Sequence, residues 1–367
     1  MARLGDVCKI VSGSTPSTTA TDYWDGDIKW ITPAELDENS FYITDSVRHI
    51  TELGRTKTGL SYMPIGTVIL SSRAPIGKTA IAGCEMCCNQ GFKNLICSDK
   101  IHNEYLYFFL KGKTEFLNSL GRGATFKELS KSIVENIEVP LPSYEEQIKI
   151  SGHMRKIEEL LRLRKQQLSK LDELVKSRFI ELFGNSNYPC ESLDNNVIEM
   201  FIGPFGSSLK NEFFVDEEDG FCMVYEQKHA IQKTMHVPTR YVLKSKYEEL
   251  KRFTVLGGDI IVSCRGTIGE IYTVPDDAPM GIMHPSIMKI RLKTEKYNQR
   301  FFVFALKQYM DEHSAEAKGS GVKMAVSATV LGQSDFVMPP LEVQNQFAAF
   351  VEQVDKSKLY SEMEVAA

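Results

Sequence analysis

The chain has 367 residues, of which 43% are hydrophobic and 25% charged, and its formal net charge is −5. This length is sufficient for two cores of ordinary size, and the composition is that of a soluble globular protein. The acidic balance excludes a generally basic surface, so a DNA-binding role would require cations gathered on one face. No apolar run in the sequence approaches membrane-spanning length, and the N-terminal residues lack the apolar core of a signal peptide, so we expect a cytoplasmic protein.

The eight cysteines are scattered along the chain and do not resemble a disulfide framework. Cys84, Cys87 and Cys88 could form a zinc cluster with Cys97, because thiolates gathered in a short segment bind this metal. The spacing to Cys97 is short, however, no histidine lies nearby, and the second half of the chain has no equivalent. We therefore interpret these residues as buried thiols and expect no metal site.

The first 142 residues predict a mixed α/β domain in which strands are separated by polar, glycine-containing loops. A polar loop at 12–19 precedes a strand with Trp30, which we interpret as a core residue and not as a base-stacking group. Residues 65–77 are typical of a turn, a buried strand and a loop that carries Arg73. The elements expected next are an aromatic-rich helix at 105–110 and a glycine loop at 121–123.

Residues 143–184 predict one long helix, because the segment has no proline and only one internal glycine, Gly152. Its apolar residues recur on a seven-residue frame, which is typical of a helix that pairs with another helix along one seam. At 1.5 Å per residue, a helix of about forty residues is roughly 60 Å long. The alternative is a helix folded back onto its own domain, although one small domain would not cover this length. The residues expected on the seam are Ile150, Met154, Ile157, Leu161, Leu168, Leu171 and Val175.

The segment after the long helix repeats the segment before it. The strand and loop at 65–77 return at 257–269, and the proline corner at 139–147 returns at 336–344. The period of about 195 residues is too long for a solenoid, so we interpret the chain as two copies of an α/β domain, a proline corner and a helix. Two matching copies predict antiparallel pairing of the helices and an approximate two-fold relation between the halves. The pairing residues expected in the second helix are Phe347, Val351 and Val354.

These features together resemble the specificity subunit of a type I restriction–modification system, and the resemblance covers essentially the whole chain. It rests on the opening residues 4–13, on the strand at 30–33 and on the motif at 66–77 with its second copy. The most specific feature is the proline corner that runs into a long helix, which occurs twice. The fold class expected is therefore α/β (α+β), with two similar target recognition domains separated by long antiparallel coiled-coil helices.

The resemblance implies that each α/β domain reads one half of a bipartite site in double-stranded DNA. The helices would set the distance between the half-sites and help to dock two methyltransferase subunits. The chain itself would have no catalysis and no cofactor, because S-adenosylmethionine, ATP and magnesium would act on the methyltransferase subunits and the restriction/translocase subunits. The implied parts are recognition domain 1 at 1–142, the central helix at 143–184, recognition domain 2 at 185–339, and a C-terminal helix with a tail at 340–367.

The sequence departs from the family pattern in its C-terminal helix, which we expect over about 340–360, roughly half the length of the central helix, with 361–367 frayed. The far end of the central helix, 168–182, would then lack its partner. Another subunit would cover this unpaired end, or a second copy of the chain would do so by self-association.

Motifs for catalysis are missing from the sequence, including the glycine-rich cofactor loop and the Asn-Pro-Pro-aromatic motif of a DNA methyltransferase. Residues 72–79 imitate a phosphate-binding loop, but Ser72 replaces its first glycine and the repeat has Glu270 in place of Lys78. These features disfavour a self-contained methyltransferase and an ATP site. The remaining alternative is a coiled-coil scaffold whose α/β domains bind proteins, which the negative net charge slightly favours.

DNA recognition uses cations and backbone amides for phosphates, and Arg, Asn, Gln or small polar groups for base edges. The polar loops at 12–19 and 203–210 suit this role, although such loops are also common as solvated turns. Arg73 and Arg265 occupy equivalent positions after a buried strand, where they would contact DNA or pair with an acidic neighbour. The candidate DNA contacts are Ser14, Thr15, Ser17, Arg73, Gln90, Lys93, Arg122, Lys127, Ser207, Ser208, Lys210, Gln227, Lys228, Arg265, His284 and Lys323.

Overall fold

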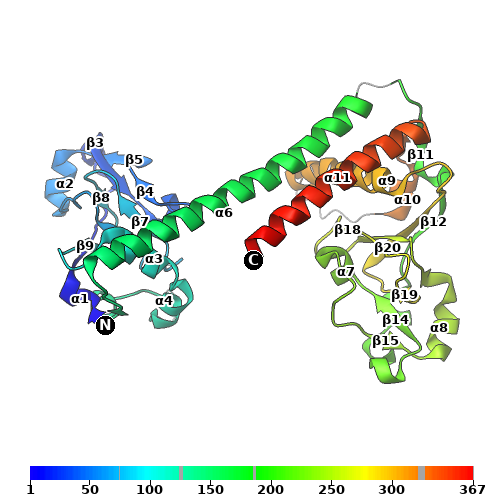
Figure 1. The fold of residues 1–367 in the computed structure, drawn as a ribbon, viewed down its shortest axis with the longest axis horizontal. Helices are drawn as coiled ribbons and strands as arrows, with labels where there is room; N and C mark the ends of the chain where they lie inside the picture. Colours follow the sequence, from blue (N-terminus) through cyan, green and yellow to red (C-terminus); the bar gives the residue numbers. More distant parts are fainter. Residues whose placement is uncertain (74, 124–126, 185–186, 321–326, 367) are drawn as a thin grey trace. The chain divides into compact units, whose positions relative to one another are not determined.

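The computed structural model describes the chain except residues 74, 124–126, 185–186, 321–326 and 367, and for 314–320 and 360–366 it describes the backbone only. Its contacts divide the chain into two compact units, Met1–Leu163 and Arg164–Ala367. The division falls inside the long helix α6 (Tyr144–Phe179), so each unit contains one half of this helix (Figure 1). Sequence analysis predicted this helix over 143–184, and its last five residues, Ile180–Gly184, form a π-helical turn.

The first unit contains a five-stranded sheet of order β2-β9-β6-β7-β4, a three-stranded sheet of order β5-β3-β8, and the pair β1-β10. Its strands are β1 (Ala2–Arg3), β2 (Cys8–Ser12), β3 (Trp24–Ile31), β4 (Tyr42–Ile43), β5 (Arg48–Ile50), β6 (Val68–Leu70), β7 (Thr79–Ala82), β8 (Cys87–Cys88), β9 (Lys93–Cys97) and β10 (Glu138–Val139). Its helices before α6 are α1 (Leu4–Val7), α2 (Glu52–Thr58), α3 (Asn103–Lys111), α4 (Thr114–Leu120) and α5 (Lys131–Glu135).

Strand β6 lies in the middle of this unit and is buried on both faces, which explains its unbroken apolar sequence. Val68 and Leu70 point to one side, where they share a cluster with Leu106 of α3. Ile69 points to the other side and packs with Ile31 of β3. Helices α3, α4 and α5 therefore cover one face of the five-stranded sheet, and the three-stranded sheet covers the other.

The second unit has the same plan, with sheets of order β12-β20-β17-β18 and β13-β15-β14-β19-β16 and the pair β11-β21. Its strands are β11 (Cys190–Ser192), β12 (Val197–Ile202), β13 (Phe214–Val215), β14 (Cys222–Tyr225), β15 (Tyr241–Val242), β16 (Thr254–Val255), β17 (Ile260–Ser263), β18 (Ile271–Thr273), β19 (Gly281–Met283), β20 (Ile287–Leu292) and β21 (Asp335–Val337). Its helices are α7 (Gln227–Gln232), α8 (Lys244–Leu250), α9 (Gln299–Ser320), α10 (Ala328–Gln333) and α11 (Leu341–Ala366).

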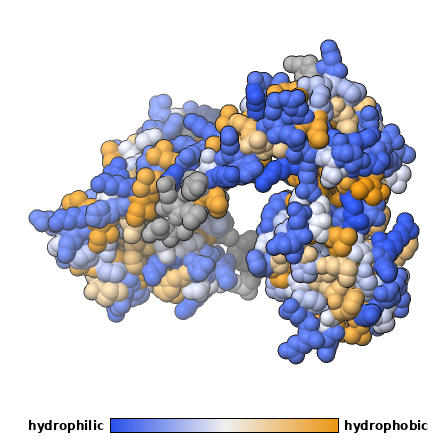
Figure 2. All heavy atoms as spheres, turned by 45° about the vertical axis from the view of Figure 1, so that its right-hand side comes forward, coloured by the Kyte–Doolittle hydropathy of each residue, from blue (hydrophilic) through white to orange (hydrophobic). Residues whose placement is uncertain are grey.

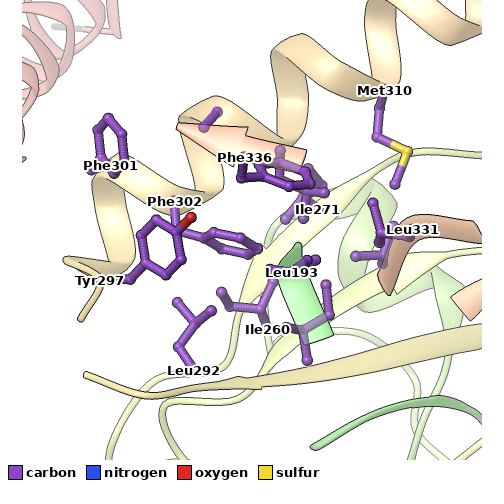
Figure 3. Packing of buried hydrophobic residues seen from close by; sticks show 14 of the residues in the cluster. Leu193, Ile260, Ile271, Leu292, Tyr297, Phe301, Phe302, Met310, Leu331 and Phe336 are labelled. Atoms are coloured by element: carbon purple, nitrogen blue, oxygen red, sulfur yellow. The ribbon is translucent and has the colours of Figure 1, made fainter. Parts of the chain in front are cut away.

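Strand β17 takes the place of β6 in the second unit and is buried on both faces in the same way. Ile260 packs against the helical layer that contains Phe302 and Leu331, and Figure 3 shows these side chains turned toward one another. Ile261 faces the opposite side and packs with Tyr225 of β14. The predicted duplication therefore extends to the layer structure of each unit.

Within the second unit, helix α11 packs antiparallel against the second half of α6. The ring centroids of Phe179 and Phe347 are 5.5 Å apart near the start of α11, and Lys358 Nζ lies 2.6 Å from Asp172 Oδ1 further along. Residue numbers therefore rise along α11 as they fall along α6. The expected seam residues Leu171, Val175, Phe347, Val351 and Val354 belong to this one hydrophobic cluster.

This pairing corrects the prediction that residues 168–182 of the central helix lack a partner. Because α6 ends and α11 begins in the same unit, an antiparallel partner covers the C-terminal end of α6 first. The α11 helix, at 26 residues, is also longer than expected and continues through Ala366. The uncovered apolar residues lie instead in the first half of α6. Side chains that are at least 37% exposed there include Ile150, Met154, Ile157 and Leu161.

The first half of α6 contacts its own unit mainly through polar side chains. Arg155 Nη1 lies 3.3 Å from Glu104 Oε1 of α3, and Lys111 of the same helix pairs with Glu158. Ser151 on this face is buried. One face of the helix is thus held to α3, while the apolar seam on its other side is exposed.

The surface is largely hydrophilic on the face of the molecule drawn in Figure 2, with hydrophobic residues scattered between the polar ones. Among the described residues, no helix combines the length and the hydrophobicity that crossing a membrane requires.

Candidate nucleic-acid interface

The loops after β6 and β17 are closed by matching hydrogen bonds. The amide of Ser71 donates to the carbonyl of Lys78 at 2.8 Å, and that of Ser263 donates to the carbonyl of Glu270 at 2.9 Å. Each serine hydroxyl then accepts the amide proton of that same partner at 2.9 Å. The loops place Arg73 and Arg265 two residues after the matched serines, so the two arginines are structurally equivalent.

Both loops close on a glycine that requires a positive φ angle. Gly77 has a φ of 97° and Gly269 a φ of 85°. Side chains rarely adopt this conformation, so glycine is needed for the chain to turn back toward the next strand. Their amides donate to the carbonyls of Ser71 and Ser263 at 3.1 and 2.9 Å. Gly77 and Gly269 therefore help to fix the conformation of the loops that carry Arg73 and Arg265.

The polar glycine loops at 12–19 and 203–210 lie against the loops that precede β9 and β20. A Cβ atom on Gly13 would lie 2.0 Å from the carbonyl oxygen of Cys88, and one on Gly203 would lie 2.3 Å from that of His284. Only glycine permits such close backbone approach. The hydroxyl of Thr15 donates to Gln90 Oε1 across this contact, which brings two predicted site residues together.

The loops that precede β9 and β20 repeat one hydrogen bond with different residues. The amide of Gly91 donates to Asn89 Oδ1 at 2.9 Å, and the amide of Ser286 donates to His284 Nδ1 at 3.2 Å. Asn89 and His284 also donate their own amides to the ends of β3 and β14, at 3.0 and 2.9 Å. The backbone is conserved between the copies while the side chains differ.

A matching pair of capped turns follows β3 and β14. The amide of Thr32 donates to Glu35 Oε1 at 2.7 Å, and the amide of Glu226 donates to His229 Nδ1 at 3.0 Å. The second of these turns begins α7 and carries Gln227 and Lys228. Four segments lie together in each unit, and we call them the neighbourhood of that unit. They are the loop that carries Arg73 or Arg265 (the arginine loop), the polar loop at 12–19 or 203–210, the loop before β9 or β20, and this capped turn.

In the first unit, the cations of this neighbourhood share one carboxylate. Arg73 Nε lies 3.0 Å from Glu128 Oε2, and Lys93 Nζ lies 3.2 Å from Glu128 Oε1. Lys93 is nearly buried, and its ammonium also donates to Ser72 Oγ at 3.4 Å. Burial alone would raise the pKa of Glu128, but the hydrogen bonds from Lys93 and Arg73 outweigh it and lower this pKa below its usual value.

In the second unit, the carboxylate of the neighbourhood is Glu226, which is buried. Burial would raise the pKa of Glu226, but hydrogen bonds from Arg240 and Lys228 lower it instead. Lys228 Nζ lies 2.8 Å from Glu226 Oε2, and the guanidinium of Arg240 also lies over the ring of Phe214, 3.8 Å from its centroid. Glu226 is therefore paired with Lys228 and Arg240, and neither of these cations belongs to the arginine loop.

The neighbourhood of the second unit carries a surplus of positive charge. Burial lowers the pKa of His284; Glu226 opposes this effect, whereas Arg240, Arg265 and Lys228 strengthen it. His284 is therefore neutral near pH 7, with its Nδ1 engaged by Ser286. Three cations and one carboxylate act on the same imidazole, which favours an anionic partner.

The remaining predicted contacts have varied surroundings. The backbone carbonyl of Ser14 accepts a hydrogen bond from Trp30 Nε1 at 3.0 Å. The hydroxyl oxygen of Ser17 lies 2.9 Å from that of Thr19. Lys210 Nζ lies 3.9 Å from Glu212 Oε1. Lys323 lies outside the described residues. The side chains of Arg122, Lys127 and Ser207 are exposed, whereas Ser208 is partly exposed.

Comparison with known protein families shows which family this chain belongs to. The model of the type I restriction modification DNA specificity domain matches residues 1–173 and 210–364. The chain belongs to this family. Each match to the specificity domain includes one α/β region and most of one long helix, which agrees with the duplication in the sequence.

Curated relatives are specificity subunits as well. The chain is 41% identical over 186 residues to the MjaIX specificity subunit of Methanocaldococcus jannaschii, which covers 50% of this chain and 42% of the relative. It is 27% identical over 148 residues to the HindI specificity subunit of Haemophilus influenzae, covering 40% of this chain and 32% of the relative. The matches thus span less than half the length of these two specificity subunits.

Solved structures share the fold of this specificity protein. A chain from a structure of complex assembly in the type I R-M system aligns with a TM-score of 0.61 and 17% identity, covering 100% of this chain and 93% of the other. The S subunit from M. genitalium aligns with a TM-score of 0.54 and 15% identity, covering 99% and 91%. At these identities the likeness establishes the fold alone.

Sequence reasoning about this specificity protein missed four residues that the structure adds to the neighbourhoods. Glu128, Glu226 and Arg240 set the charge around the equivalent loops, and only for Glu128 did the sequence offer a signal, its place beside the cations of the glycine loop. Phe205 is 87% exposed between Pro204 and Leu209, both buried, in the 203–210 loop. It stands where the first unit has Thr15, and its exposure cannot be read from the sequence.

Proposed function

We propose that this specificity protein is the sequence-specific DNA-binding subunit of a type I restriction–modification complex. Each α/β domain reads one half of a bipartite site in double-stranded DNA, and the two helices set the spacing between the half-sites. The observation that carries the proposal is the pair of equivalent neighbourhoods, in which the backbone hydrogen bonds match while the side chains differ. A shared frame with variable side chains is what two readers of different sequences require.

The chain is proposed to act without catalysis of its own. Two methyltransferase subunits dock on the helices and supply S-adenosylmethionine chemistry, and restriction/translocase subunits supply ATP- and magnesium-dependent cleavage. The exposed apolar residues in the first half of α6, such as Ile157 and Leu160, support a docking role, because isolated apolar stripes on a helix favour helical partners. A type I complex of this kind acts on half-sites that lie on one face of the duplex, separated by about one helical turn of roughly 10 base pairs.

A domain exchange tests this proposal. Residues 1–142 are replaced by the corresponding part of another specificity subunit, and the complex with its methyltransferase is expressed in a host that lacks methylation of its own. Sequencing of methylated sites is expected to show one half of the recognition sequence changed and the other half retained. The matched control exchanges 185–339, which should change the opposite half. A change in both halves, or in neither, contradicts the modular reading.

The net charge of −5 favours a second candidate, a scaffold whose α/β domains bind proteins. Mobility-shift measurements with the methyltransferase present and absent separate the two functions. A DNA reader forms a salt-sensitive complex that a duplex of its methylated sequence competes away better than a scrambled duplex. A protein-binding scaffold shows no such preference.

A further inference from the structure

Arg73 and Arg265 are displayed by equivalent loops but have different electrostatic surroundings. The equivalence is fixed by the strand register, because Ser71 bridges Phe92 in the first unit and Ser263 pairs with Ile287 in the second. Lys93 of the first unit therefore corresponds to Met288 of the second. The buried cation of one neighbourhood is an apolar core residue in the other.

The first unit commits Arg73 to its own fold. Its backbone forms an isolated antiparallel bridge with Glu128, and its guanidinium pairs with the same residue at 3.0 Å. The amide of Leu129 also donates to the carbonyl of Ser72 at 2.9 Å, so the segment around Glu128 runs along the arginine loop. An approaching phosphate would meet the carboxylate of Glu128 together with the arginine.

The second unit leaves Arg265 available. Among the described residues, its exposed side chain has neither an ion pair nor a hydrogen bond. Residues 319–327, which hold the chain position of the Glu128 segment before the next short helix, contain no Asp or Glu in their sequence. The nearby carboxylate of Glu226 is already held by Arg240 and Lys228.

The surroundings of Arg265 suit the reading of a base. The next residue, Gly266, has a φ of 66°, and a Cβ atom there would lie 3.6 Å from Gln227 Oε1. That oxygen is buried and makes no hydrogen bond among the described residues. An arginine, a glutamine and a histidine thus converge on one edge of the second unit, and arginine and glutamine are the side chains that read guanine and adenine through paired hydrogen bonds.

We propose that Arg265 contacts the target DNA directly, whereas its counterpart Arg73 positions the arginine loop of its own unit and makes no essential DNA contact. This inference rests on the proposed function. The two domains thus use one loop position in two ways. Acceptor atoms of DNA are the ligand of Arg265, either O6 and N7 on the guanine edge in the major groove or the oxygens of a backbone phosphate.

The expected effects differ in size for physical reasons. A paired arginine–guanine contact accounts for between about fivefold and 150-fold in affinity. An exposed ion pair such as Arg73–Glu128 changes an equilibrium constant by less than about fivefold. The pair alone therefore does not prevent Arg73 from contacting DNA. The repulsion between the Glu128 carboxylate and a DNA phosphate adds to the cost of breaking the ion pair. Together the two costs cancel the binding free energy that a contact through Arg73 would supply.

The test compares Arg265→Ala with Arg73→Ala in the complete complex with its methyltransferase subunits, because the two positions are matched controls for one another. Dissociation constants are measured by fluorescence anisotropy on a duplex that carries the methylated sequence and on a scrambled duplex, between 50 and 200 mM salt. Arg265→Ala is expected to weaken binding to the methylated sequence at least about fivefold, and Arg73→Ala less than about threefold.

The salt series shows whether Arg265 contacts a guanine edge or a phosphate. A guanine contact gives a loss confined to the methylated sequence, with relaxed preference at one position of one half-site. A phosphate contact gives an equal loss on both duplexes and a salt slope smaller by about one. Both results support the proposal.

Equal effects of the two substitutions, or no effect of Arg265→Ala on a complex that binds its sequence, overturn the proposal and leave the DNA-reading function intact. A wild-type complex that does not distinguish the two duplexes overturns both. A circular dichroism spectrum and a melting temperature for each variant show whether a loss of binding comes from misfolding. Arg265→Lys, which retains the charge without the paired donors, is expected to recover phosphate binding but not guanine reading.

Discussion

Gln344 makes, at the start of α11, the same three hydrogen bonds that Gln147 makes at the start of α6. The carboxamide nitrogen of each donates to a proline carbonyl five residues earlier, at 2.8 Å for Gln344 and 3.0 Å for Gln147, and to a lysine carbonyl, at 3.0 and 3.1 Å. The carboxamide oxygen of each accepts a backbone amide at 2.8 Å, from Asn298 or His102. Both side chains are fully buried, so each glutamine fastens a long helix to its own domain.

Replacing either buried glutamine should weaken the attachment of one helix. Gln344→Ala removes the side-chain partner of one backbone amide and of two carbonyls, and we expect a loss of about 2–3 kcal/mol in unfolding free energy. Urea denaturation followed by circular dichroism measures this loss. The control is Gln346→Ala on the exposed side of the same helix, which should stay within about 0.5 kcal/mol of the wild type. Equal stability of the two variants would refute the anchoring role.

The aromatic contacts between α6 and α11 should be a major source of stability in the second unit. Phe347 is fully buried and packs against Phe179 and Phe183, with centroids 5.5 and 5.7 Å away. Phe347→Ala should therefore cost about 3–5 kcal/mol, because it removes a buried ring and leaves a cavity. Leu359→Ala, on an exposed position of the same helix, is the control. A cost below 1 kcal/mol for Phe347→Ala would show that the helices are held together by other contacts.

The carboxylate of Glu128 should make the stability of the first unit depend on pH. Because folding lowers the pKa of Glu128, its ionised form favours the folded state, and this contribution is complete above the ordinary value of 4.5. It is lost as the pH falls through the lower pKa of the folded state. Glu128→Gln should be less stable than the wild type at pH 7, by roughly 1–2 kcal/mol, since the nearly buried Lys93 loses its counter-ion.

The pH test compares the melting temperatures of the wild type and Glu128→Gln from pH 7 down to pH 3. The difference between them is expected to be largest at neutral pH and to shrink below pH 4. Glu115→Gln, also in the first unit, controls for the removal of one negative charge. A difference that stays constant with pH would mean that the carboxylate charge does not contribute.

The exposed face on the first half of α6 should matter for assembly and not for folding. Ile157 and Leu160 are 50% and 62% exposed, so Ile157→Lys with Leu160→Lys should change the unfolding free energy of the isolated chain by less than about 1 kcal/mol. Binding of the methyltransferase subunits should fall at least tenfold, as measured by isothermal titration calorimetry. Lys156→Ala on the same turn serves as the control. Wild-type affinity in the double variant would exclude this face as the docking surface.

The length of α6 should determine the spacing of the two half-sites. Seven residues inserted between Leu163 and Arg164 add two helical turns, or about 10 Å, and leave the contacts of α11 with residues 171–183 in place. This length corresponds to about three base pairs of duplex, so the gap in the methylated sequence should lengthen by that amount. Methylome sequencing reads the gap directly, and an unchanged gap would show that the helix is not the spacer.

The duplicated plan of this protein can be predicted from its amino-acid sequence, because local patterns carry it. The apolar runs at β6 and β17 predicted buried strands, the segments that end at Gly77 and Gly269 predicted loops, and the proline corners predicted where each long helix begins. Such features depend on backbone sterics and on periodicity within a short window, so they can be read without knowing which distant residues meet.

Which groups become partners depends on how the folded chain packs. Arg73 and Arg265 look alike in sequence, but one is paired because the segment around Glu128 lies along its loop, and the other is left without an ion pair among the described residues. The covered end of α6 was also misjudged, because the antiparallel course of α11 places Phe347 beside Phe179. Ion pairs and helix seams join residues far apart in the chain, and their distance is fixed by the packing of whole layers, which no local pattern contains.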